Sequence, residues 1–110
     1  MRPREEGPAC AVGWTKVAIG HPALAGHFPG HPLVPGVVVL ECVLGVLREW
    51  LVPGAVLAAI PAVKFSRRIE PEELFMIGIE LLSPTQARFI CRCQGNAAAA
   101  GTLLLAPAPA

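Results

Sequence analysis

The chain has 110 residues, of which 54% are hydrophobic and 15% charged, and its formal net charge is +1. This length fits one domain, and a near-neutral charge without any tyrosine argues against nucleic-acid binding, which needs a basic surface and aromatic residues for stacking. The sequence has no unbroken run of about 20 apolar residues and no apolar signal core after its charged first residues, so we expect neither a membrane span nor a secretory signal. A small domain this apolar is expected to cover part of its surface with a partner subunit, which predicts a cytoplasmic homo-oligomer.

The first half of the chain predicts a strand, a loop and one helix. Residues 12–19 alternate loosely and include β-branched residues, which is typical of a strand. Residues 21–35 are dense in Pro and Gly, so we expect a loop with a restricted backbone. The run "VVVLECVLGVLREW" after Pro35-Gly36 is too long for an ordinary strand and begins with a proline that suits a first helical turn. This helix is apolar nearly all round, so we expect it to be buried, and Pro53-Gly54 ends it.

The second half predicts four antiparallel strands separated by Pro, Gly, Asn or Ser. Phe89, Cys91 and Cys93 alternate with polar residues, as in a half-buried strand, and "QGNA" is typical of a hairpin turn. The order of elements predicts an α+β fold, an antiparallel sheet around one long buried helix, in a single domain over residues 1–110 with flexible tails at 1–10 and 106–110. The four predicted strand runs are residues 55–66, 74–83, 87–96 and 97–106.

The cysteines and histidines do not form a recognisable metal-binding pattern. Cys91 and Cys93 lie in a predicted strand and Cys42 in the apolar helix, so we interpret them as small core residues of a protein in a reducing compartment. The spacing Cys91-Arg92-Cys93 is not typical of a zinc site. His27 and His31 are four residues apart, but the Pro and Gly between them exclude a helix that would present them together. We therefore expect no metal site.

One stretch, "GHFPGHPLVPGVVVLE" from residue 26 to residue 41, combines groups that could carry out chemistry. Glu41 lies in an apolar run, where a carboxylate is costly to bury unless it is paired or neutral. It either faces a partner subunit or a buried Arg, or is held in the protonated form that suits a general acid. His27 lies in the rigid loop, and the helix start at Gly36 offers an unpaired backbone N–H. Together these groups could remove a proton next to a carbonyl and stabilise the enolate-like oxygen.

The same stretch closely resembles the signature of the β-hydroxyacyl-acyl carrier protein dehydratases of the FabA/FabZ type, which have the hotdog fold. The His-to-Glu spacing is also that of the family. The resemblance continues more weakly through "AVKFSRRIEPEEL" and "ARFICRCQGNAAAAGTLLL". The matching residues are His27-Phe28-Pro29, Pro32, Pro35-Gly36-Val37 and Glu41.

The resemblance implies a role for each matching residue. His27 would be the base that removes the α-proton, and Glu41 would protonate the departing β-hydroxyl. The backbone N–H of Gly36 would hold the thioester carbonyl, and no cofactor would be needed. Glu rather than Asp at position 41 is similar to the branch of the family that only dehydrates. Three further matching residues would contribute to the substrate site: Phe28, Pro35 and Val37.

The resemblance also implies partners. The family works as a hotdog dimer in which His and Glu from different subunits complete each site, so we expect a dimer or a multiple of dimers, or a heterodimer with another hotdog protein. The carrier protein would be acidic, and Lys64, Arg67 and Arg68 are candidates for binding it, although they could equally be an ordinary solvated patch. The family commonly has Gln where this chain has Gly45, and the segment before the motif is short. Such shortened relatives are similar to dehydratases of specialised pathways, including aryl polyene synthesis.

Two alternatives stay open at this point. A hotdog thioesterase could use Glu41 to activate water. A non-catalytic subunit could pair with an active dehydratase, and the departure at Gly45 favours this reading, whereas the presence of both His27 and Glu41 argues against it.

Overall fold

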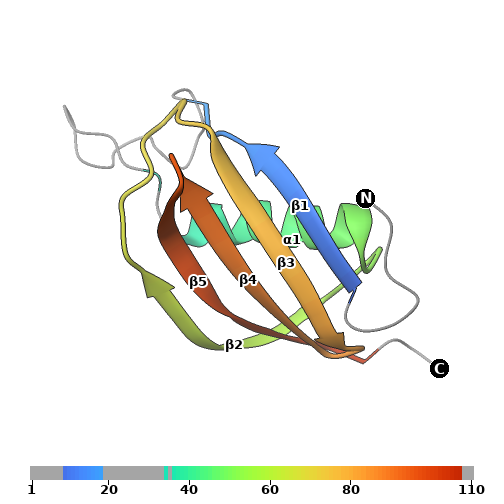
Figure 1. Ribbon diagram of the computed structural model, residues 1–110. Helices are drawn as coiled ribbons and strands as arrows, with labels where there is room; N and C mark the ends of the chain where they lie inside the picture. The colour runs from blue at the N-terminus through green and yellow to red at the C-terminus, as the bar shows by residue number, and fades with distance from the viewer. Residues whose placement is uncertain (1–8, 19–33, 35, 108–110) are drawn as a thin grey trace.

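The computed structural model describes residues 9–18, 34 and 36–107 of the chain. Within these residues, five strands form one antiparallel sheet in the order β1-β3-β4-β5-β2, and one helix, α1, lies across one face of it (Figure 1). The predicted α+β class, with a sheet around one helix, is therefore confirmed. The elements in chain order are β1 (Ala9–Thr15), α1 (Gly36–Trp50), β2 (Leu57–Phe65), β3 (Phe75–Ser83), β4 (Gln86–Cys93) and β5 (Asn96–Leu105).

The strand register places one row of residues across the whole sheet, from the β1 edge to the β2 edge. The row consists of Gly13, Ile77, Cys91, Ala99 and Phe65, each paired with the next. Both ends of this row approach the helix closely. A Cβ at Gly13 would lie 2.8 Å from a methyl group of Val46, and a Cβ at Gly36 would lie 2.8 Å from the ring of Phe65. The helix therefore begins at the β2 edge and crosses the sheet toward β1.

The core lies between α1 and the sheet face that this row defines. The helix buries Val39, Val43 and Leu47, whose spacing of four residues places them on one face. In β4 the burial alternates as predicted, because every second residue points toward the helix. The main sheet residues buried in this core are Phe75, Ile77, Ile79, Phe89, Cys91, Cys93, Ala99 and Leu103.

The expectation of a fully buried helix is wrong for the single chain. Val37 is 62% exposed, and Glu41 and Arg48 are also exposed. One sheet covers only one face of a helix, so the opposite face needs a second surface to bury it. The apolar composition of this helix thus exceeds what its own sheet can cover.

Two predicted boundaries also change. The first strand begins at Ala9 rather than residue 12, because β1 follows β3 along most of its length, from Ala9 opposite Leu81 to Thr15 opposite Phe75. Residues 9 and 10 of the predicted tail at 1–10 therefore belong to β1. At the other end, Ala106, the first residue of the predicted tail at 106–110, donates its N–H to the carbonyl of Val56.

The predicted hairpin turn between β4 and β5 is confirmed. Cys93 pairs with Asn96, which leaves Gln94 and Gly95 as a two-residue turn. Both have positive φ, 52° and 80°, as the mirror-image turns of tight hairpins require.

Candidate active site

The structure places some of the predicted site residues and leaves others outside the described part. His27, Phe28 and Pro35 lie outside the described residues. Gly36 and Val37 form the first turn of α1, and Glu41 follows on the next turn. The basic residues Lys64, Arg67 and Arg68 lie at the end of β2 and in the segment after it.

A pocket of about 410 Å³ opens at the start of α1. Gly36 and Val39 form its helix wall, and the aromatic ring of Phe65 lies against Gly36. The first turn of α1 contains no acidic side chain, so the partial positive charge of the helix N-terminus is not neutralised from within that turn. Such a site favours an oxygen that gains negative charge. The opposite wall of the pocket consists of Val34, Ser66, Arg67, Arg68 and Ile69.

Phe65 is a site residue that the sequence interpretation missed. It is the last residue of β2 and is paired with Ala99, whose side chain faces the helix. Successive residues of a strand face opposite sides of the sheet. Counting back from the polar Ser-Arg-Arg segment that follows β2 would therefore have placed Phe65 on the inner face. Phe65 is nevertheless 47% exposed, because it lies on β2, an edge strand of the sheet.

Glu41 lies on the exposed face of α1, one turn after Val37. Among the described residues its carboxylate makes no hydrogen bond or ion pair. The burial expected from its apolar neighbours in the sequence is therefore not achieved within one chain. The next position on this face is Gly45, where an added Cβ would meet nothing within 4 Å.

The thiols nearest to the helix stay protonated. Burial, followed by the charge of Glu41, raises the pKa of Cys42. Burial, followed by the proximity of Cys42, raises the pKa of Cys91 to about 12. Both effects disfavour the thiolate, so neither residue has the character of a nucleophile. The prediction that Cys91 and Cys93 are core residues is confirmed, and no disulfide joins any of the four cysteines, all of which lie in the described part of the chain.

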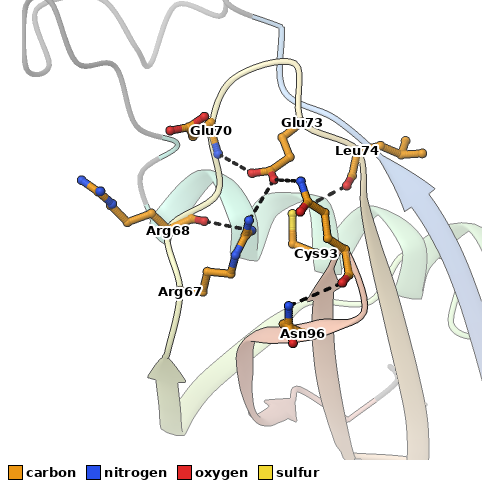
Figure 2. A network of polar contacts seen from close by, with 8 residues as sticks. Arg67, Arg68, Glu70, Glu73, Leu74, Cys93 and Asn96 are labelled. Carbon is orange, nitrogen blue, oxygen red and sulfur yellow. Dashed lines mark hydrogen bonds and ion pairs between the residues drawn. The ribbon is translucent and has the colours of Figure 1, made fainter.

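The three basic candidates differ in what they contact. Arg67 is bound within the chain: its Nη2 donates to Oε2 of Glu73 at 3.1 Å, and the side chain is 32% exposed (Figure 2). Lys64 and Arg68 are exposed, and neither side chain has a charged partner among the residues of the described part. Lys64 and Arg68 are thus available to a partner, whereas Arg67 is already paired with Glu73.

Solved structures with this arrangement of sheet and helix share one fold. A chain of the dehydratase heterocomplex ApeI:P from Xenorhabdus doucetiae superposes with a TM-score of 0.78 at 24% identity, over 96% of this chain and 98% of that one. An uncharacterized protein from Erwinia carotovora subsp. atroseptica superposes with a TM-score of 0.82 at 22% identity, over 94% and 88%. The protein is a hotdog-fold protein, as the sequence predicts.

The sequence comparisons narrow this class to a family. A family model described as "ApeI-like: ApeI dehydratase" matches residues 4–102. The 3-hydroxyacyl-[acyl-carrier-protein] dehydratase FabZ of Acetivibrio thermocellus is 33% identical over 107 residues, 87% of this chain and 73% of that protein. The FabZ of Syntrophotalea carbinolica is 32% identical over 73% of this chain, which spans only 60% of that protein. The chain belongs to the ApeI-like dehydratase family, within the FabA/FabZ type of hotdog dehydratases.

Two further findings bear on the environment of the site. No helix in the described ranges is long and apolar enough to cross a membrane. Within the same residues, no group of three or more His, Cys, Asp or Glu side chains is placed to hold a metal ion.

Proposed function

We propose that the protein removes water from a 3-hydroxyacyl thioester on acyl carrier protein and forms the trans-2-enoyl thioester. The position of Glu41 carries this proposal. Its carboxyl group projects from the exposed face of α1, one turn beyond the helix start that borders the 410 Å³ pocket. A thioester carbonyl at Gly36 would place the carbons next to it within reach of this face.

In this reaction, His27 takes the proton from the carbon next to the thioester carbonyl. The electron pair of the broken C–H bond forms the new double bond. The bond from the β-carbon to its hydroxyl oxygen breaks, and Glu41 donates the proton with which that hydroxyl leaves as water. The backbone N–H at Gly36 stabilises the carbonyl oxygen while it carries negative charge.

A second subunit completes the site in this proposal. The exposed face of α1, which carries Glu41, and the edge strand β2 both present exposed apolar side chains, with Val37 62%, Val63 39% and Phe65 47% exposed. A hotdog partner seated on this face would bury these side chains and bring its own histidine loop to Glu41. It would also exclude bulk water from the reacting groups. We propose a homodimer or a multiple of dimers.

The carrier protein would approach from the side of Lys64 and Arg68. Both are exposed, and Arg68 lines the same pocket as Gly36. An acidic carrier protein attracted to these charges would direct its thioester arm into the pocket.

The test is to incubate the purified protein with a 3-hydroxyacyl carrier protein, or with its trans-2-enoyl counterpart. Intact-protein mass spectrometry then follows the loss or gain of one water. We expect interconversion, with His27→Ala and Glu41→Gln each reducing the rate about 10²–10⁴-fold. Glu49→Gln is the matched control, because it removes an exposed carboxylate from the same helix and is expected to retain activity.

Other outcomes would overturn the proposal. Release of free acid and carrier thiol would identify a thioesterase. An intact thioester with no change in mass would indicate a non-catalytic chain that needs an active partner. A hotdog protein that co-purifies and restores activity would then identify the heterodimer, as opposed to a homodimer.

A further inference from the structure

One loop, residues 66–74 between β2 and β3, contacts both ends of the segment that carries His27. The N–H of Glu72 donates to the carbonyl of Val17 at 2.8 Å, and the N–H of Val34 donates to the carbonyl of Ile69 at 3.0 Å. A salt bridge of 3.1 Å between Lys16 and Glu72 adds to the first contact. We call residues 66–74 the bracket loop, because it holds the chain both before residue 19 and after residue 33.

The anchored positions belong to the hydrophobic core. Val17, Val34 and Ile69 are 3%, 8% and 4% exposed. Val34 lies two residues before Gly36, and Val34 and Ile69 both line the pocket at the helix start. A shift of the bracket loop would therefore move the entry to α1 as well as one wall of the pocket.

Glu73 holds the bracket loop in its conformation through both carboxylate oxygens (Figure 2). Its Oε2 accepts hydrogen bonds from Arg67 at 3.1 Å and from the side-chain amide of Gln94 at 3.2 Å. Its Oε1 accepts the N–H of Glu70 at 3.1 Å. The carboxylate thus ties together the start of the loop, its middle and the β4–β5 hairpin.

The backbone of the bracket loop requires such support. Glu72 has a φ of 67°, a left-handed conformation that is costly for a residue with a side chain. This is the residue whose N–H binds Val17. Glu73, the next residue, is the one that anchors the loop, and its side chain is only 16% exposed.

We propose that Glu73 is a positioning residue for the active site. Through Arg67 and Gln94 it fixes the bracket loop, and the bracket loop fixes Val17 and Val34, the two ends of the segment that carries His27, beside the helix start. The catalytic part of this inference rests on the proposed dehydratase function. Arg67 then stabilises the bracket loop through its bond to Glu73, and Lys64 and Arg68 remain as the candidates for binding the carrier protein.

Kinetics of Glu73→Gln test the proposal with two substrates: a 3-hydroxyacyl carrier protein and a small 3-hydroxyacyl thioester of N-acetylcysteamine. We expect kcat to fall roughly 10- to 100-fold with both substrates while KM changes little, because a small displacement of reacting groups costs this much. Glu73→Asp keeps the carboxylate and should recover part of the loss. Glu70→Gln is the matched control, because it removes the same charge from the same loop without removing a side-chain contact.

Amide hydrogen exchange at Val34 and Glu72, followed by NMR, is the second readout and does not depend on activity. We expect both amides to exchange about ten-fold faster in Glu73→Gln, because their hydrogen bonds open more often when the loop is released. If Glu73→Gln fails to fold, Gln94→Gly removes one of the three bonds while suiting the positive φ at that position.

The outcomes separate the inference from the function on which it rests. A wild-type kcat together with unchanged exchange in a folded Glu73→Gln protein would overturn it. A loss seen only with the carrier-protein substrate would also overturn it and would assign the Arg67–Glu73 pair to carrier binding. If the wild-type protein itself dehydrates neither substrate, the proposed function fails, and exchange alone then decides whether Glu73 holds the two anchors.

Discussion

The ring of Phe65, at the end of β2, lies against Gly36, the first residue of α1. A Cβ built on Gly36 would lie 2.8 Å from Cζ of the ring and 3.1–3.2 Å from both Cε atoms. Position 36 thus leaves no room for a side chain while the ring stays in place. This contact sets the shape of the pocket at the helix N-terminus, where the thioester carbonyl is proposed to bind.

We expect Gly36→Ala to lower kcat/KM about ten-fold with little loss of stability. Alanine favours the helix, and the half-exposed ring of Phe65 can turn away from the added methyl group. The displaced ring would then narrow or reshape the pocket. Phe65→Leu in the Gly36→Ala background should restore much of the activity, because the shorter side chain leaves space for the methyl. Steady-state kinetics of Gly36→Ala, Phe65→Leu and the double variant give the coupling energy between the two positions. Strictly additive effects would contradict the expected contact between the added methyl group and the ring.

Gly45 offers a different test on the same helix, because an added Cβ there meets nothing within 4 Å. Gly45→Ala should raise the free energy of unfolding by about 0.5–1 kcal/mol, the usual gain from replacing glycine inside a helix.

Gly45→Gln would place an amide one turn after Glu41, within hydrogen-bonding reach of its carboxyl group. We expect a higher kcat for Gly45→Gln than for Gly45→Ala. Thermal denaturation and light scattering check stability and subunit number, and a variant that dissociates would show that a partner packs on Gly45.

Much of the fold can be predicted from local patterns in the sequence. The burial of Cys91 and Cys93 follows from period-two alternation, and the Gln94-Gly95 turn follows from its glycine between two strand-like runs. These features are determined by residues close together in the chain, so they can be predicted from the sequence alone.

The parts that the sequence did not predict depend on contacts between distant segments. Glu73 meets the side chain of Gln94, 21 positions later, and nothing in the pattern of either segment signals that pair. The exposure of Glu41 in a single chain has a related cause: α1 is apolar on nearly all sides in the sequence, and only its contacts with the distant strands decide which face packs on the sheet.

The carboxylate of Glu73 should also make stability depend on pH. The backbone N–H of Glu70, followed by the Arg67 guanidinium, holds the pKa of Glu73 below its ordinary value of 4.5. Because the folded-state pKa is the lower one, the carboxylate contributes stability above the ordinary value, and this contribution is lost as pH falls through the folded-state pKa. Glu73→Gln should therefore be less stable than wild type by about 1–2 kcal/mol at neutral pH, with the difference shrinking under acid conditions. Urea denaturation of both proteins from neutral to acidic pH measures this, with Glu70→Gln as control. A constant difference across the range would show that the charge of Glu73 contributes nothing to holding the bracket loop.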